Sequence, residues 1–271
     1  ISRQIANAHT GFNLVMTLIW IPLIPLMVKI VMKLVPDGKE MGAKALENPN
    51  YLDNKLIAQP AAALQLVAKE VMYCAKIVDE MIGKLQSGNG KIDKENAGIV
   101  EEKAKMYASI NDYFAALYSG GVLTEEQASQ SAGMQSILCD IDRIGQLTRE
   151  IMETVAKQNK GKHKYSKEAL KELKKAMEQI QMIYGSCIRA ISGDVDMDIK
   201  ELMRQKEDIM QLDEKMRKNH IARVGKGKCD SKLTIPFNDV LHNIDRIGNS
   251  CVNLVEVAKE NVTMQAFFAE D

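Results

Sequence analysis

Hydrophobic residues along most of the chain recur at intervals of three and four, the spacing that places them on one face of an α-helix. The clearest example lies between Ala61 and Leu85. Its apolar stripe consists of Leu64, Val67, Val71, Cys74, Ile77, Val78 and Met81. Segments that alternate with period two, as strands do, are almost absent. The pattern therefore predicts an all-α protein.

The same periodicity predicts five further helices, which are separated by breaks rich in glycine, proline or lysine. They span approximately residues 93–118, 124–156, 166–191, 196–224 and 236–265. Thr124 and Gln127 have the spacing of a capping box, and Pro236 suits the first turn of the last helix. A lysine-rich break at 157–166 separates two sets of three helices. We therefore predict two tandem three-helix bundles, over residues 61–158 and 166–271.

The two halves share the segment IDRIG, which occurs at Ile141–Gly145 and again 103 residues later at Ile244–Gly248. Hydrophobic pairs on both sides of this segment match at the same offset. Similarity at a fixed offset is the mark of a repeated structural unit, here with the length of a small domain. We therefore interpret the chain as an internal duplication.

The N-terminal part, residues 1–36, has a different pattern because no charged residue occurs between Arg3 and Lys29. Its most apolar section is LVMTLIWIPLIPLMV, at Leu14–Val28. A helix rises about 1.5 Å per residue, so the uncharged stretch has the length to cross a hydrocarbon layer of roughly 30 Å. We expect a transmembrane helix here that contacts lipid through residues 5–34, followed by a linker at 37–60. A buried helix of a soluble protein is the alternative.

Lysines follow the apolar segment more often than they precede it, which predicts that its C-terminal side faces the cytoplasm. The chain as a whole has 36 basic and 36 acidic residues, so its net charge recruits neither nucleic acid nor a membrane surface, and any such partner must act locally. Five cysteines without a CxxC pair indicate neither a disulfide framework nor a zinc knuckle, and they fit a reducing compartment. The lysine-rich break at 157–166 could contact phosphate or anionic lipid, but a solvated basic loop is the favoured interpretation.

The repeated segment places Gly145 and Gly248 on the apolar face of a helix, with Asp142 and Asp245 at the edge of that face. Glycine costs about 1 kcal/mol relative to alanine inside a helix, so the close approach of a neighbouring helix is the natural compensation. A carboxylate beside an apolar face needs a partner. We therefore predict tight helix packing, with each aspartate paired to an Arg or Lys across the bundle.

Two segments, ILCDIDRIGQLTREI at 137–151 and VLHNIDRIGNSCVNLVEVA at 240–258, resemble the signature helices of the PhoU family. Within them, Arg143, Gly145, Arg246 and Gly248 match the family's structural signature. The opening segment IANAHTGFNLVMTLIWIPLIPL resembles the last membrane helix of bacterial sodium-dependent phosphate cotransporters, and EKMRKNHIARV resembles the helix before the second signature.

This resemblance implies a cytoplasmic PhoU-like module that regulates a sodium:phosphate symporter at the cell inner membrane. The expected partners are the membrane transport core and lipid, with a homodimer among the assemblies the sequence allows. The four histidines stand in dissimilar contexts, and no nucleophile with a neighbouring base is present. We therefore expect binding and regulation of phosphate transport rather than an enzyme.

A metal-binding helical sensor is the alternative function. In PhoU proteins, acidic residues four apart hold multinuclear metal clusters, which would imply divalent or iron ions here. Asp142 and Asp245 match the first acid, but Gln146 and Asn249 replace the second, and a neutral amide attracts a cation far less. His242 stands three residues before Asp245, a spacing that can chelate a metal. Pairing of the two aspartates with Arg or Lys remains the favoured interpretation.

Overall fold

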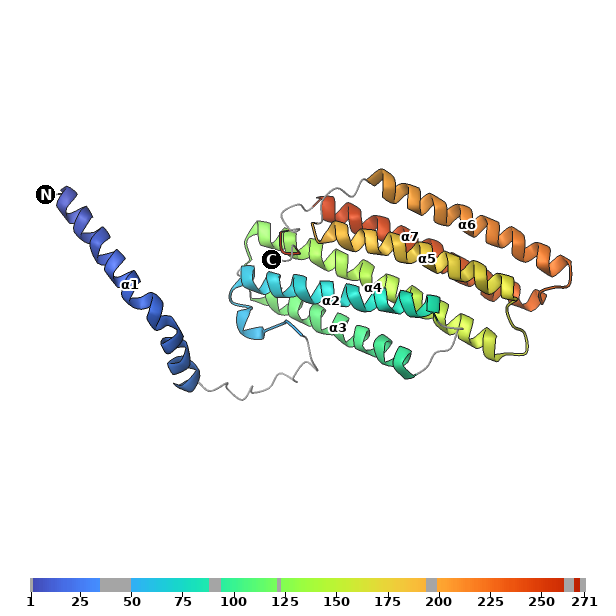
Figure 1. Cartoon of the computed structure of the whole chain (residues 1–271), viewed down its shortest axis with the longest axis horizontal. Coiled ribbons are helices and arrows are strands. Elements are labelled where there is room, and N and C mark those ends of the chain that lie inside the picture. The colour runs from blue at the N-terminus through green and yellow to red at the C-terminus, as the bar shows by residue number, and fades with distance from the viewer. Residues whose placement is uncertain are drawn as a thin grey trace. The chain divides into compact units, whose positions relative to one another are not determined.

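A computed structural model describes residues 2–34, 50–87, 94–120, 123–193, 199–260 and 266–268 of the 271-residue chain. Those residues form seven α-helices and two short 3-10 helices, without a strand (Figure 1). The prediction of an all-α protein is thus confirmed. The chain divides into two units, one from Ile1 to Leu46 and the other from Glu47 to Asp271.

The first unit contains helix α1, and the second contains the remaining helices. Their bounds are α1 Ser2–Leu34, η1 Asn54–Leu56, α2 Pro60–Ser87, α3 Lys94–Ser119, α4 Glu125–Lys160, α5 Lys167–Ile191, α6 Ile199–Gly225, η2 Ser231–Leu233 and α7 Thr234–Glu260. Six predicted helices are therefore present at their expected places. Helix α4 continues four residues beyond the predicted end, into the lysine-rich break, because lysine and glutamine are good helix formers and Gly161 comes only after Lys160.

The helix starts follow local hydrogen bonding. Thr124 accepts a bond of 3.2 Å from the backbone N–H of Gln127, and Gln127 Oε1 accepts one of 3.0 Å from the N–H of Thr124. The predicted capping box of α4 is thus confirmed. Ser166 begins α5 in a similar way, by accepting a bond of 3.2 Å from the N–H of Ala169. These caps fix where the long helices enter the bundle.

The six helices of the second unit lie alongside one another as a single compact bundle (Figure 1). Helices α2, α4, α5 and α7 contact one another at its centre, with α4 against α7 and α2 against α5. Helix α3 packs on α2 and α4, and α6 packs on α5 and α7. The division into bundles at 61–158 and 166–271 stays a prediction.

Apolar faces fill the centre of this bundle. Every member of the stripe predicted on α2 is at most 5% exposed. The largest fully buried side chains include Tyr113, Tyr184, Phe114 and Phe237. The hydroxyl of Tyr184 donates a 3.0 Å bond to the carbonyl of Ala75, which joins α5 to α2. Burial raises the pKa of Tyr184 well above its usual value, so this donor keeps its proton.

The contact between α4 and α7 contains the same pair of groups twice, and each time α4 supplies the carboxylate and α7 the amide. Asn243 of α7 donates a 3.0 Å bond to Glu150 Oε2 of α4. Asp140 of α4 is hydrogen-bonded to Asn253 of α7, and burial raises its pKa despite the nearby Arg143. Because residues 140 and 150 correspond to 243 and 253 at the 103-residue offset, the two helices pack antiparallel around an approximate two-fold axis. The duplicated sequence therefore forms the same hydrogen-bonded pair at two places in the contact between α4 and α7.

Helix α1 corrects one prediction. Many of its apolar side chains are exposed, including Phe12, Leu18 and Ile21, but within the described residues no helix combines the length and the hydropathy needed to cross a membrane. The prediction of a transmembrane helix counted every uncharged residue, although Asn13 bonds to His9 at 3.2 Å and the segment is polar there. The apolar section from Leu14 to Val28 rises only about 22 Å as a helix, less than the roughly 30 Å of a hydrocarbon layer.

Residues 50–59, which we predicted as linker, instead lie against the bundle; the preceding residues 37–49 are outside the described part of the chain. The backbone N–H groups of Asn50 and Tyr51 donate to the two carboxylate oxygens of Glu70, at 3.1 and 2.7 Å. The hydroxyl of Tyr113 donates to the carbonyl of Asp53 at 2.8 Å. Glu70 has no exposed surface. A buried carboxylate on α2 thus holds the segment that leads into the bundle.

This contact makes stability depend on pH. Burial raises the pKa of Glu70, and the bonds from the backbone lower it only in part. Between the unfolded and folded pKa values, the folded protein therefore holds a proton that the unfolded chain lacks. The stability supplied by this group is highest at low pH and falls as pH rises through the folded pKa. We expect Glu70→Gln to remove this component of the pH slope in urea unfolding, whereas Glu80→Gln, at an exposed position on the same helix, should keep it. Equal slopes in both variants would contradict the prediction.

Candidate functional site

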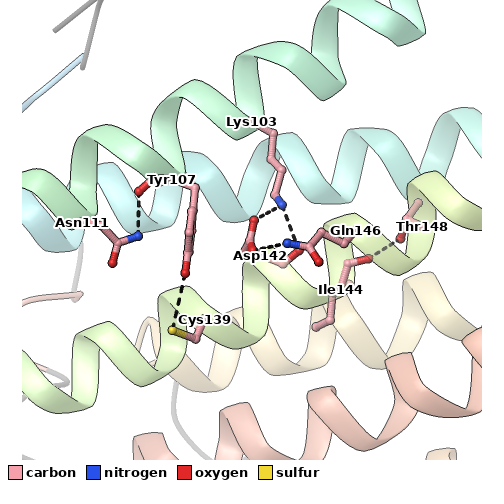
Figure 2. A network of polar contacts seen from close by, with 8 residues as sticks. All are labelled: Lys103, Tyr107, Asn111, Cys139, Asp142, Ile144, Gln146 and Thr148. Carbon is pink, nitrogen blue, oxygen red and sulfur yellow. Dashed lines mark hydrogen bonds and ion pairs between the residues drawn. The ribbon is translucent and has the colours of Figure 1, made fainter.

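The first IDRIG segment lies in the middle of α4, where Asp142 forms a buried polar network with α3 (Figure 2). Lys103 of α3 makes an ion pair with Asp142 Oδ1 and also donates a 2.9 Å bond to the backbone carbonyl of Asp142. Gln146, one turn later, donates a 2.6 Å bond to Asp142 Oδ2. The side chains of Lys103 and Asp142 are only 5% and 12% exposed. Both carboxylate oxygens therefore have partners within the bundle.

Gly145 makes room for this ion pair. A Cβ atom at this position would lie 2.8 Å from Cε and 3.2 Å from Nζ of Lys103, and 3.1 Å from Cγ2 of Val78. The lysine side chain thus crosses the helix at the position where any other residue would carry a side chain. Its end cannot move aside without leaving Asp142. The predicted close approach at this glycine is confirmed, and the approaching group is a lysine side chain.

Neighbouring polar groups extend the network along α3 and α4. The hydroxyl of Tyr107 lies 3.9 Å from Sγ of Cys139, and Asn111 donates a 2.9 Å bond to the carbonyl of Tyr107. Burial, helped by Cys139, raises the pKa of Tyr107. On α2, burial raises the pKa of the Cys74 thiol to about 12, although Lys103 opposes the change. Both groups are therefore neutral near pH 7, and neither is an activated nucleophile.

The second IDRIG segment, in α7, has the same residue types in a more open arrangement. Lys206 of α6 stands 103 residues after Lys103 and is half-buried, as is Asp245. Asn249 donates a 3.3 Å bond to Asp245 Oδ2. A Cβ atom at Gly248 would meet only Cγ of Lys206, at 4.0 Å, an ordinary contact. Among the described residues, no ion pair joins Lys206 to Asp245.

The structure separates the predicted site residues. Pairing of Asp142 with a cation across the bundle is confirmed, whereas no cation of the described residues pairs with Asp245. Arg143 and His242 are exposed, and Arg246 is half-buried. Within the described ranges, no three His, Cys, Asp or Glu residues come together in a way that could hold a metal. The metal site at Asp142, Asp245 and His242 stays a prediction. At Asp142, the ammonium of Lys103 lies where a metal ion bound to this carboxylate would lie.

Sequence reasoning missed Lys103, although the chain carried a signal for it. Lys103 and Lys206 are themselves 103 residues apart, like the glycines and aspartates with which they lie. His220 is only 1% exposed, although Arg217, Lys218 and Arg223 lie near it in the sequence. Its ring stacks on Phe237 with centroids 4.5 Å apart, and its Nε2 lies 3.2 Å from Oγ1 of Thr234. Burial lowers the pKa of His220, and Arg223 lowers it further.

Comparison with known proteins shows a distant similarity to proteins named for the export of phosphate. The chain is 22% identical over 221 residues to the Escherichia coli (strain K12) protein named "Putative inorganic phosphate export protein YjbB", a match that covers 80% of this chain and 40% of that protein. A relative of the same name from Salmonella typhimurium is 22% identical over 228 residues, covering 82% and 41%. The chain thus spans about two fifths of the length of these curated relatives. No protein-family model and no solved structure matches it.

These relatives are named for export of inorganic phosphate and not as enzymes. The match extends over most of the chain. The similarity is distant, and it covers less than half the length of these relatives.

The two glycines of the repeat offer a matched test of the packing. We expect Gly145→Ala to lower the free energy of unfolding by about 1–3 kcal/mol, because the added methyl group displaces Lys103 or Val78. Gly248→Ala meets no such contact and should leave stability unchanged or raise it by up to about 1 kcal/mol, through better helix propensity. Chemical denaturation measures both. Equal effects at the two positions would contradict the asymmetry of the repeats.

The two lysines provide a second test. Lys103→Met leaves the carboxylate of Asp142 buried without its cation, so we expect a loss of about 3–5 kcal/mol of stability. Lys206→Met is the control and should change stability by less than about 1 kcal/mol, because Lys206 is half-buried. The double variant Lys103→Met with Asp142→Leu should recover most of the loss, since it leaves no unpaired charge. A double variant as unstable as Lys103→Met alone would show that the lysine acts through packing and not through charge.

Proposed function

We propose that this chain is a regulatory helical module of a protein that moves inorganic phosphate across the cell inner membrane. The observation that carries the proposal is the similarity to relatives named for phosphate export, which extends over 80% of the chain. The resemblance of the two IDRIG helices to PhoU signature helices supports it. The relatives' name specifies export, whereas the opening segment resembles sodium-driven cotransporters. Export and sodium-driven cotransport have in common that phosphate moves across a membrane.

We propose that the transport path belongs to a membrane core that the relatives carry outside the matched region. The relatives are about two and a half times as long as the part matched here, so they have room for such a core. The bundle would then dock on the cytoplasmic side of the core. Helix α1 exposes apolar side chains such as Leu14, Trp20 and Ile24, which suits contact with apolar helices or adjoining lipid.

Regulation requires that the module favour one state of the core over another. The contacts of the bundle suit this role because the two repeats differ. In the first repeat a buried ion pair lies over the glycine, whereas in the second the space beside the glycine is less filled. The two halves therefore offer unlike surfaces to a partner. Among the described residues, the thiol of Cys74 and the phenol of Tyr107 are held neutral, which suits a structural role better than catalysis.

Deletion of the bundle from the longer protein tests this proposal. We expect removal of residues 50–271 to abolish the dependence of phosphate flux on phosphate supply, with the amount of protein in the membrane held equal by immunoblot. Lys215→Gln, an exposed substitution on α6, serves as the control and should leave the regulation intact. Phosphate flux that responds identically to phosphate supply with and without the bundle would contradict the regulatory role.

A further inference from the structure

Two lysine-rich loops meet at one end of the six-helix bundle. Residues 161–166 join α4 to α5, and residues 226–233 join α6 to α7. Figure 1 shows both loops at the same end, and an ion pair between His163 Nδ1 and Asp230 Oδ2 connects them. The sequence alone presented one basic break, and the fold adds a second beside it. We call this surface the lysine end.

The lysine end concentrates positive charge in a chain that is neutral overall. Its exposed lysines are Lys157, Lys160, Lys162, Lys164, Lys167, Lys171, Lys226, Lys228 and Lys232. The same stretches, 157–171 and 225–235, contain only two acidic residues, Glu168 and Asp230. Nine lysines and two acids leave a formal charge of +7. The lysine end therefore attracts an anionic partner.

The loops are held in place, so this charge is fixed before any partner arrives. Asp230 accepts a 2.8 Å bond from the backbone N–H of Lys232 in addition to its pair with His163. Tyr165 is 5% exposed, and its ring lies 5.9 Å from that of Phe237. Ser166 caps α5. A prearranged surface loses less conformational freedom on binding than mobile loops would.

Large apolar side chains accompany the lysines. Ile221, in the last turns of α6, is 67% exposed, and Ile235, in the first turn of α7, is 73% exposed. Exposed isoleucines framed by lysines are typical of surfaces that bind anionic bilayers, where the lysines contact headgroups and the apolar side chains enter the interface. The two aromatic rings at this end, of Tyr165 and Phe237, are buried. These two rings are therefore not accessible for stacking on nucleic-acid bases.

Arginine guanidinium groups can bind phosphate in a bidentate manner, but those near this end are already paired with carboxylates. Arg223 pairs with Glu172 at 2.8 Å, and Arg217 pairs with Asp213 at 2.8 Å. The exposed lysines come from two loops and the adjoining helix ends, so they spread over a surface and do not converge on one ion. We propose that the lysine end binds the surface of a membrane that contains anionic lipid. This proposal is independent of the role in phosphate transport.

Hydrogen exchange of the full chain on lipid vesicles tests the proposal. Helix α1 exposes apolar side chains and can bind any vesicle, so the readout must be local. On vesicles of phosphatidylcholine with phosphatidylglycerol, we expect amide exchange in the two loops to slow several-fold. On phosphatidylcholine alone, the loops should exchange as they do in solution. High salt should reverse the protection, because it screens exposed charges.

Two variants with the same change in net charge locate the effect. The first replaces lysines of the two loops, as Lys162→Gln, Lys164→Gln, Lys226→Gln and Lys228→Gln. The control replaces exposed lysines elsewhere, as Lys69→Gln, Lys105→Gln, Lys200→Gln and Lys215→Gln. We expect the first variant to lose the protection and the control to keep it. All substitutions are at exposed positions, and matching thermal unfolding curves would establish that both variants fold.

Ile235→Ser gives a further variant that tests insertion into the interface. It should weaken the protection on anionic vesicles while leaving its salt dependence intact.

Several outcomes would overturn the proposal. They are equal protection on neutral vesicles, protection that survives in the loop variant, and protection by inorganic phosphate alone without vesicles. Protection of the loops by a single-stranded oligonucleotide, with none on anionic vesicles at the same salt concentration, would assign the lysine end to nucleic acid instead.

Discussion

The antiparallel contact between α4 and α7 is the constraint on which the rest of the bundle depends. Each of these helices carries one copy of the repeated segment, and each supplies a carboxylate or amide that the other satisfies, as Asn243 does for Glu150. The two pairs lie at corresponding positions of the two copies, so a shift of one helix along the other would break both pairs together. The pairs therefore fix the register of the two copies. With that register set, α2 meets α5 at the centre, and α3 and α6 are left to cover the outer sides.

Helices α3 and α6, which cover the outer sides, are attached unequally, although they occupy equivalent positions in the duplicated sequence. In the first repeat, the ammonium of Lys103 lies over Gly145 and is buried against Asp142. The compact ammonium of lysine, carried on a flexible chain, occupies this space. In the second repeat, Lys206 only touches the space over Gly248, and Asp245 is satisfied by Asn249 on its own helix. A buried ion pair contributes little net stability, but it makes one arrangement of α3 much better than its alternatives.

Sequence pattern predicted the helices, the capping box of α4 and the buried stripe of α2, because each depends on neighbours a few residues apart. It also indicated that Gly145 faces a close neighbour. It could not identify Lys103 as that neighbour, since the contact spans 39 residues of chain and lysine is usually a surface residue. The burial of His220 could not be predicted for a similar reason, because basic residues surround it in the sequence while Phe237, 17 residues later, stacks on its ring. For α1, counting uncharged residues overstated the apolar length, since polar groups such as Asn13 count as uncharged.

The unequal attachment of α3 and α6 bears on how such a module could signal. Helix α6 presents large exposed apolar side chains at Met203, Met210 and Ile221, which lie within about 20° of one another around the helix because they are separated by 7 and 11 residues. At the level of the repeated segment, α3 is tied to α4 by a buried charge, whereas α6 is tied to its neighbours near its C-terminal end, where Arg223 pairs with Glu172 and Arg217 donates to Asn238. A partner that covers the apolar side of α6 would therefore act on a helix whose ion pair to the bundle lies toward one end. Coupling between binding and conformation is strongest where the competing internal interactions are weakest, which in α6 is the part that lies over Gly248.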